Sequence, residues 1–265
     1  MKIHPTCIIE GDVVIGEGVE IGPYTVIRGN VSIGKDTKIG SHVVIEGNVE
    51  IGEKNLIYPH AYIGGHPQDL SYRGEKSFIK IGNNNTIREF VTIHTASGEG
   101  NFTKVGDSNY IMAYAHLAHN VEVGNHCIIV NAAQLAGYVK VDDHAFVSGL
   151  VGVHQFARIG GYSIVGGGVR VSQDVLPFMM VAGDPPKVYG LNIVGLRRKG
   201  FSKERIAVLK KAFDILCRKG LSLPSAIDTI KSELPLNDDI KYLLDFISSS
   251  KRGVLRRPAN EREED

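Results

Sequence analysis

Two histidines, His116 and His119, stand close together in the segment Ala113–Gly124, near the middle of the chain. Imidazole titrates near neutral pH, so a histidine can take a proton from a weakly acidic group and pass it on. Three imidazoles that converge on one point can instead hold a zinc ion. The pair is therefore the first candidate for a reactive site, provided that the fold brings other functional groups to it.

The scaffold around these histidines is a six-residue repeat. In steps of six from Ile3 to Val171, every position is Ile, Leu or Val except Asp69, Glu75 and Glu99. A period of six matches neither the helix nor the twisted strand, and it fits a short strand followed by a sharp turn. Three such sides close a triangular coil. Glycine often follows the aliphatic residue, and we expect it to occupy the corners, where unusual dihedrals are needed.

We therefore predict a mainly β protein, built as a parallel β-helix of hexapeptide repeats with a C-terminal α-helical domain. Successive coils would stack about 4.8 Å apart through backbone hydrogen bonds. An ordinary β-sandwich gives no reason for a six-residue phase to persist over most of the chain.

Helical signals follow where the repeat ends, after Pro177. Ser202, Ser222 and Asn237 are suitable N-cap residues, and we expect helices over 203–219, from Ser222, and from Asn237 to about 250. The predicted domains are a β-helix over residues 1–189 and an α-helical domain over residues 190–265, with a disordered tail from Pro258.

Composition indicates a chain that acts from solution. The net charge of +1 argues against binding of nucleic acid, and the sequence has no long apolar run for membrane insertion. Three cysteines without metal-type spacing are typical of reduced thiols, so we expect a cytoplasmic protein.

Two segments interrupt the repeat. Residues 64–80 are polar but keep the six-residue phase, and they contain Asp69, a candidate ligand-binding residue. The second segment, Ala96 to Thr103, is rich in glycine and carries no distinct signal.

Four motifs in order give the chain a family resemblance. They are Pro67–Leu70, Ala115–His119, Val153–Phe156 and Gly190–Ser202, and they accompany the hexapeptide array. The set resembles the UDP-N-acetylglucosamine O-acyltransferases of lipid A biosynthesis over nearly the whole chain. The resemblance implies a left-handed β-helix and a homotrimer with sites between subunits. It also implies transfer of an (R)-3-hydroxyacyl group from acyl carrier protein to the 3-hydroxyl of UDP-N-acetylglucosamine, without a metal or another cofactor.

The same resemblance implies residue roles. His119 would be the general base, and the Gly137 backbone N–H would donate to the oxyanion. Gly167 would set the acyl-chain length by leaving the groove open for a long chain. The substrate-binding residues would be Asp69, Ser71, His94, His116, His154, Gln155, Asn192, Arg198 and Lys199. His126 and His144 are expected to be surface or stacking residues.

Several positions depart from the family pattern. Asn120 follows the predicted base where Asp is usual, so it can accept from the ring but brings no full charge. Restoring the family residue with Asn120→Asp is expected to leave activity intact or to raise it. Ser71 replaces Lys, and Tyr138, Val194 and Pro185 replace other contact residues.

The sequence leaves alternatives open. An acceptor with a 3-amino group would give the same transfer as an N-acylation. A γ-class zinc carbonic anhydrase shares the repeat, but its motifs are absent and its chain is shorter. The third alternative is a scaffold protein without catalytic activity. It would not explain the specific loops or the basic segment around Arg198.

Overall fold

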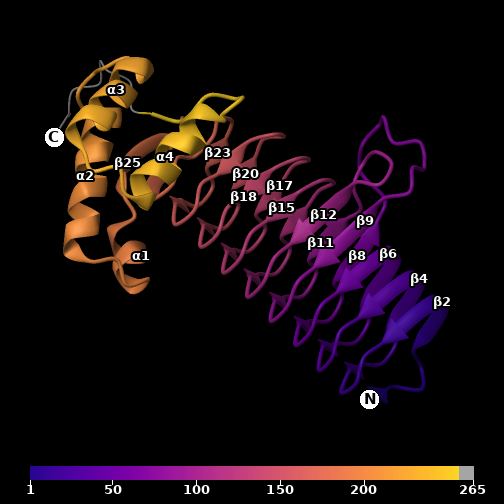
Figure 1. Ribbon diagram of the computed structural model, residues 1–265. Helices are drawn as coiled ribbons and strands as arrows, with labels where there is room; N and C mark the ends of the chain where they lie inside the picture. The colour runs from indigo at the N-terminus through magenta and orange to yellow at the C-terminus, as the bar shows by residue number, and fades with distance from the viewer. Residues whose placement is uncertain (257–265) are drawn as a thin grey trace.

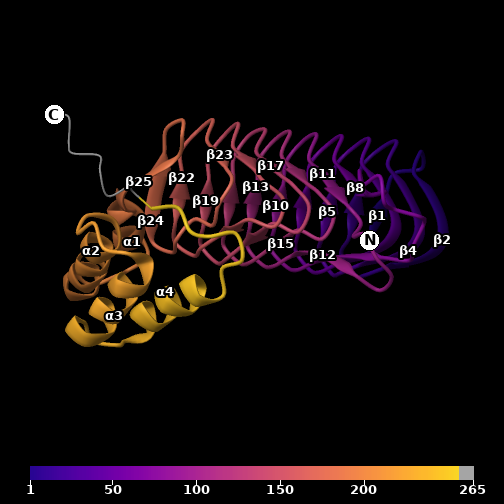
Figure 2. The same ribbon diagram turned by 90° about the horizontal axis from the view of Figure 1, so that it is seen from above.

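The chain forms a stack of triangular coils with a group of helices at one end (Figure 1). The computed structural model describes residues 1–256. The N-terminus lies at the far end of the stack from the helices, as the view from above also shows (Figure 2). The predicted parallel β-helix with a helical C-terminal region is confirmed.

One face of the stack is an 11-stranded sheet whose strands come from successive coils and pair in parallel, except for an antiparallel last pair. The register of the parallel pairs on this face is kept from coil to coil; for example, Ile21 lies against Ile3 and Ile39 against Ile21. In order, the strands are β1 (Lys2–Ile3), β3 (Glu20–Ile21), β5 (Lys38–Ile39), β7 (Leu56–Ile57), β10 (Thr86–Ile87), β13 (Tyr110–Ile111), β16 (Ile128–Ile129), β19 (Phe146–Val147), β22 (Ile164–Val165), β24 (Met179–Ala182) and β25 (Lys187–Leu191).

The other two faces belong to one 14-stranded sheet, because three long strands turn the corner between them. Gly29 sits at this corner with φ 101°, and a Cβ there would lie 2.6 Å from the carbonyl oxygen of Gly47. The long strands are β2 (Ile8–Ile15), β4 (Val26–Ile33) and β6 (Val44–Ile51). The second face continues with β8 (Tyr62–Gly65), β11 (Thr92–His94), β14 (His116–Leu117), β17 (Gln134–Leu135), β20 (Gly152–Val153) and β23 (Arg170–Val171). The third continues with β9 (Phe78–Ile81), β12 (Phe102–Val105), β15 (Glu122–Val123), β18 (Lys140–Val141) and β21 (Arg158–Ile159).

The core is a set of aliphatic columns inside the prism. On the second face, Ile45, Ile63, Ile93 and Leu117 lie in register on consecutive coils and are all fully buried. Each such side chain contributes about 1.5–3 kcal/mol relative to exposure. The six-residue phase therefore reflects an aliphatic position on each side of the prism whose side chain packs in the core.

Most glycines after the aliphatic residues do not play the predicted corner role, although Gly64 has a positive φ of 107°. Gly34 has no positive φ, and the left-handed conformation falls two residues later, on Asp36 with φ 56°. Gly34 is required for a different reason, since a Cβ there would lie 2.5 Å from the carbonyl carbon of Gly52 on the next coil. Close stacking of coils thus selects glycine at this position, and the corner itself tolerates other residues.

The predicted N-terminal ends of the helices are confirmed. The side chains of Ser202, Ser222 and Asn237 accept hydrogen bonds from backbone N–H groups in the first turns of α2, α3 and α4. The sequence did not predict α1, and α2 and α4 end about two residues earlier than expected. The helices are α1 (Ile193–Arg198), α2 (Lys203–Cys217), α3 (Leu223–Glu233) and α4 (Asp238–Ser248).

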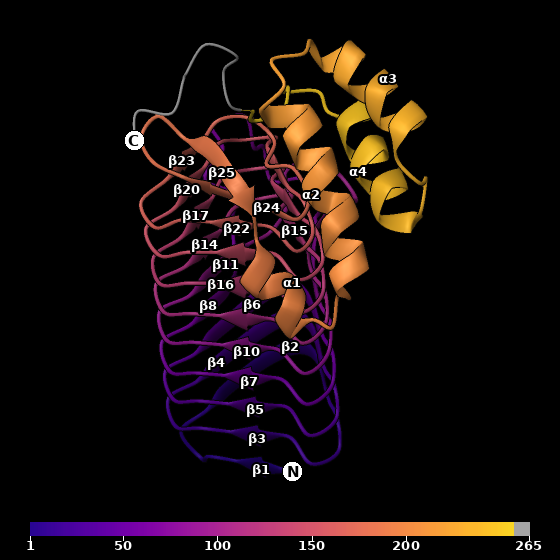
Figure 3. The same cartoon turned by 90° about the vertical axis from the view of Figure 1, so that its left-hand side faces the viewer.

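The helices lie against the end of the stack, where Figure 3 shows them at its upper edge. In α4, the Tyr242 hydroxyl donates to Asp142 (2.6 Å) and accepts from the backbone N–H of Gly161 (2.7 Å). The division proposed at residue 189 falls inside β25 and stays a prediction. The disordered tail expected from Pro258 lies outside the described residues.

Candidate active site

His119 lies in the turn after β14, and its side chain is almost completely buried. The Tyr138 ring from the next coil meets it edge-on, with 5.3 Å between ring centroids. The backbone of Gly137 passes so close that a Cβ there would lie 2.5 Å from His119 Nε2. The structure therefore brings together the predicted base and the predicted oxyanion donor.

Asn120 determines which nitrogen of His119 carries the proton. Its Oδ1 lies 2.9 Å from Nδ1 of His119 and accepts from the backbone N–H of Ser97, also at 2.9 Å. Its Nδ2 donates to the carbonyl of Ser97 at 3.1 Å, which fixes the amide orientation. Because an amide oxygen can only accept, the neutral ring has its proton on Nδ1 and a lone pair on Nε2. Nε2 is thus ready to accept a proton.

The first loop brings Asp69 to the same point. Asp69 Oδ2 lies 4.0 Å from Nε2 of His119, and its Oδ1 accepts from the backbone N–H (2.9 Å) and hydroxyl (2.7 Å) of Ser71. These hydrogen bonds from Ser71, with one from Ser97, lower the pKa of Asp69 to about 2. A negative charge therefore stands beside the base at neutral pH.

His94 and His116 adjoin the base on the second face. Burial, with the neighbouring His116 and His119, lowers the pKa of His94 to about 4, and burial with His119 also lowers the pKa of His116. The two rings meet edge-on with 4.8 Å between centroids, and His116 Nδ1 lies 2.7 Å from the Thr92 hydroxyl. Both histidines are thus neutral polar groups at neutral pH.

A cavity of about 500 Å³ opens beside His119 and extends toward the helical end. Its lining contains the predicted residues His116, His154 and Gln155 together with Gly137. His154 donates from Nδ1 to the Gln155 carbonyl at 3.0 Å, which leaves its Nε2 as an acceptor. No hydrogen bond from the Gly137 N–H occurs within residues 1–256, so this donor is available beside the base.

Other predicted residues lie elsewhere on the chain. Asn192 is the N-cap of α1, where its Oδ1 accepts from Gly195 N–H (3.1 Å) and its Nδ2 donates to the Tyr162 carbonyl (2.9 Å). Arg198 ends this helix and Lys199 follows it. Neither these residues nor Gly167 line the cavity. Burial lowers the pKa of His144, and the charge of Lys199 contributes to this shift. Lys199 therefore lies near His144, which is at a different corner of the prism from His119.

Sequence reasoning missed Ser97 and Gln68. Ser97 bonds both Asn120 and Asp69, and Gln68 lines the cavity. Gln68 belongs to the quoted loop motif, so its neighbour Asp69 could have drawn attention to it. Ser97 stands in the segment that had no distinct signal, and only the stacking of the two loops reveals it.

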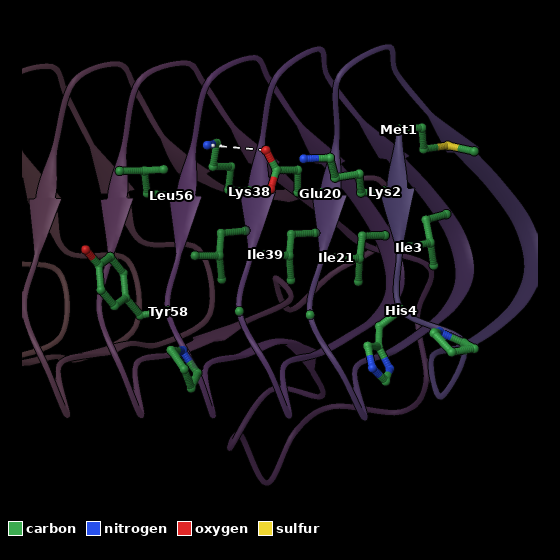
Figure 4. A pocket seen from close by; sticks show the side chains of 15 residues that line it. Met1, Lys2, Ile3, His4, Glu20, Ile21, Lys38, Ile39, Leu56 and Tyr58 are labelled. Atoms are coloured by element: carbon green, nitrogen blue, oxygen red, sulfur yellow. Dashed lines mark ion pairs between the residues drawn. The ribbon is translucent and has the colours of Figure 1, made fainter.

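Cavity volume alone would place the active site elsewhere on the chain. A larger hollow of about 840 Å³ lies at the N-terminal end of the first face (Figure 4). There Lys2, Glu20, Lys38 and Leu56 come from successive strands, and Lys38 pairs with Glu20 at 3.3 Å. None of the predicted site residues lines it. Within residues 1–256, no group of three His, Cys, Asp or Glu side chains is placed to hold a metal ion.

Comparison with known proteins gives the chain its family. Residues 174–255 match the second-domain model described as UDP-N-acetylglucosamine O-acyltransferase, and residues 2–29, 30–65 and 102–137 match the bacterial transferase hexapeptide model. The acyl-[acyl-carrier-protein]–UDP-N-acetylglucosamine O-acyltransferase of Halorhodospira halophila is 46% identical over 257 residues, which are 96% of this chain and 99% of that protein. The enzyme of the same name from Thermodesulfovibrio yellowstonii is 56% identical over 72% of this chain and 74% of its own. This chain belongs to the UDP-N-acetylglucosamine O-acyltransferase family.

Solved structures agree with membership of the acyltransferase family. The UDP-N-acetylglucosamine acyltransferase from Bacteroides fragilis superimposes with a TM-score of 0.94 at 41% identity, over 96% of this chain and 99% of that one. The likeness therefore includes the coils, both loops and the helical region. Among the described residues, no helix combines the length and the apolar character needed to cross a bilayer.

Proposed function

We propose that this protein transfers an (R)-3-hydroxyacyl group from acyl carrier protein to the 3-hydroxyl of UDP-N-acetylglucosamine, the first step of lipid A biosynthesis, in the cytoplasm. Near-full-length relatives named as UDP-N-acetylglucosamine acyltransferases, one of them with acyl carrier protein as the donor, support acyl transfer to this sugar. The observation that carries the residue roles is the close approach of the Gly137 backbone to the Nε2 edge of His119. A general base and an oxyanion donor at one point are what acyl transfer to a hydroxyl needs.

In this mechanism, His119 Nε2 accepts the proton of the sugar 3-hydroxyl as its oxygen attacks the thioester carbonyl. The new C–O bond leaves a negative charge on the carbonyl oxygen, which accepts a hydrogen bond from the Gly137 N–H. Collapse of this intermediate breaks the C–S bond. The proton held by His119 passes to the departing thiolate of the carrier, so His119 is neutral again at the end of the cycle.

The remaining site residues would bind and orient the acceptor. Asp69, braced by Ser71, and the neutral His94 and His116 line the approach to His119 and suit sugar hydroxyl and amide groups. His154 and Gln155 extend this surface along the cavity. Asn120 holds the base in the productive tautomer and is its orienting partner.

We also propose a homotrimer in which a neighbouring subunit completes each site. Asn192, Arg198 and Lys199, assigned to the nucleotide and its diphosphate, stand away from the cavity of their own chain. A neighbour could bring its copies to that cavity. Exposed stacked rings along one corner, among them Phe90 and Tyr114, provide apolar surface for such a contact. Sedimentation of the active protein should show a trimer, and an active monomer would overturn this assignment.

The deciding assay offers 3-hydroxyacyl carrier proteins to the purified protein together with either UDP-N-acetylglucosamine or its 3-amino analogue. Mass analysis of the products should show an ester on the first sugar. Exclusive acylation of the amino sugar would replace this proposal by an N-acyltransferase. Absence of any acyl transfer with both acceptors would remove it.

A further inference from the structure

Ser97 connects two groups of the site, the Asn120 amide and the Asp69 carboxylate, and forms no hydrogen bond with His119 itself. It lies in the loop between β11 and β12 and is 7% exposed. Its backbone N–H and carbonyl both bond the side chain of Asn120, and its hydroxyl donates to Oδ2 of Asp69 at 2.9 Å. One buried residue thus holds the partner of the base and the carboxylate beside the base.

The peptide groups of Ser97 require an amide at position 120. The N–H of Ser97 faces Asn120 Oδ1, and the carbonyl of Ser97 faces Asn120 Nδ2 at 3.1 Å. The same carbonyl accepts a second hydrogen bond from Nδ2 of Asn101, at 2.8 Å. A carboxylate at position 120 would place an oxygen without a hydrogen against this buried carbonyl, which leaves two acceptors facing each other.

The hydroxyl of Ser97 completes the support of Asp69. The Oδ1 atom of Asp69 is held by Ser71, within the same loop, whereas Oδ2 is held across loops by Ser97. Oδ2 is also the atom that lies 4.0 Å from His119 Nε2. Without the Ser97 hydroxyl, the first loop would lose its side-chain link to the second loop at the point where both meet the base.

We propose that Ser97 is a positioning residue that acts through two partners, with its peptide groups on Asn120 and its hydroxyl on Asp69. The proposal rests on the acyl transfer proposed above. The Asn120 contacts keep the neutral His119 ring protonated on Nδ1, and the Asp69 contact keeps the sugar-binding carboxylate in place. The N–H and carbonyl of Ser97 in the second loop therefore fit the amide of Asn120, which stands where the family usually has Asp. Accordingly, we expect Asn120→Asp to lower activity, in place of the unchanged or raised activity expected from the sequence.

Steady-state kinetics can distinguish the contact of Ser97 with Asp69 from its contact with Asn120. Ser97→Ala removes only the hydroxyl, so KM for the UDP-sugar should rise about threefold to tenfold while kcat changes less than about twofold. Asn120→Asp disturbs the base, so kcat should fall about tenfold or more while that KM changes little. Ser97→Thr keeps a hydroxyl and should restore most of the affinity lost in Ser97→Ala.

Two further measurements exclude a general loss of structure. In an Asp69→Ala background, where the Ser97 hydroxyl has no acceptor at position 69, Ser97→Ala should add less than about a twofold rise in KM, because the hydroxyl acts through that carboxylate. Nitrogen NMR of His119 is measured in the free protein at a pH high enough for the ring to be neutral. In the wild type it should show the proton on Nδ1. In Asn120→Ala it should show a mixture of tautomers.

Each outcome bears on the proposal separately from the function. If the wild type shows no acyl transfer, the proposed function fails. The NMR result still reports whether Asn120 holds the proton of His119 on Nδ1. If the wild type is active, full kcat in Asn120→Asp overturns the amide requirement. A rise in KM from Ser97→Ala that is as large in the Asp69→Ala background as in the wild type contradicts the proposed contact of the Ser97 hydroxyl with Asp69.

Discussion

Gly137 and His119 approach each other so closely that no side chain fits between them. A Cβ atom at Gly137 would lie 2.5 Å from Nε2 of His119, well inside van der Waals contact. The contact places the backbone of Gly137, from one coil, against the reactive edge of a ring from the preceding coil. Glycine at this position is thus a requirement of the site as well as of the fold.

Gly137→Ala should therefore displace the His119 ring and loosen its hydrogen bond to Asn120. We expect kcat to fall about 10²-fold, since a shift of about 1 Å in a catalytic group has that effect. Gly152→Ala is the matched control, because Gly152 lines the same cavity and a Cβ there meets no atom within 4 Å. Equal kcat values for the two variants would show that the ring does not need this placement.

His119→Ala should lower kcat by ~10²–10⁴-fold, because only the general base is lost. Binding of the UDP-sugar, measured by calorimetry, and the thermal unfolding midpoint should stay close to those of the wild type. The control is His126→Ala, since the His126 ring stacks on His144 at 4.9 Å and is expected to have no role in the reaction. Near-normal turnover in His119→Ala would assign the base elsewhere.

Gly167→Met should shift acyl preference toward shorter chains. A Cβ at Gly167 meets only the Gly149 carbonyl oxygen, at 3.4 Å, and the φ of Gly167 is not positive, so the variant should fold. Each buried methylene contributes ~0.8 kcal/mol where it fits, whereas overpacking costs ~1–3 kcal/mol. Competition between ten-, twelve- and fourteen-carbon hydroxyacyl carriers measures the shift. An unchanged length profile would mean that another residue limits the chain.

We expect the helical region to bind the acidic carrier protein through a basic surface. The basic residues are Arg197, Arg198, Lys199, Lys203, Arg205, Lys210, Lys211, Arg218 and Lys219. Arg205 pairs with Asp239 and Arg218 with Asp214, whereas Lys210 and Lys211 on α2 are exposed and form no ion pair within residues 1–256. The double variant Lys210→Glu and Lys211→Glu should raise the KM for the carrier, and added salt should reduce the difference.

The control for this surface carries the same charge change at the far end of the stack, as Lys2→Glu with Lys35→Glu. Both lysines are exposed on N-terminal coils. The control should leave the KM for the carrier unchanged. If both double variants raise that KM equally, overall charge and not the α2 surface governs the encounter.

Burial of His94 should make the folded state sensitive to mild acid. Its pKa falls from 6.5 to about 4 on folding, so between these values the unfolded chain binds more protons than the folded chain. Stability should be complete above about pH 6.5 and decline as the pH falls toward 4, by at most about 3 kcal/mol from this group. Denaturant unfolding across this range should show a shallower decline in His94→Gln. An unchanged slope would mean that His94 is not protonated on unfolding.

Features that repeat locally could be predicted from the sequence. The aliphatic residues at steps of six specify an inward position of each strand, because from Ile21 to Val171 every aliphatic residue at these steps is buried. The N-caps Ser202, Ser222 and Asn237 act on backbone groups three residues away, so their local pattern was sufficient. The pairing of Ala115–His119 with the other motifs likewise identified the family and the candidate base.

Other features depend on contacts between coils, and the sequence did not reveal them. The reason for glycine at position 34 is the next coil at Gly52, and the reason for glycine at position 137 is the His119 ring. Ser97 shows no signal of its own, since its partners Asn120 and Asp69 are 23 and 28 residues away. Hydrogen bonds of this kind form only after the coils have stacked in register and two loops have met above them. The repeat therefore specifies the scaffold, and the stacking distance between coils decides which polar groups become a site.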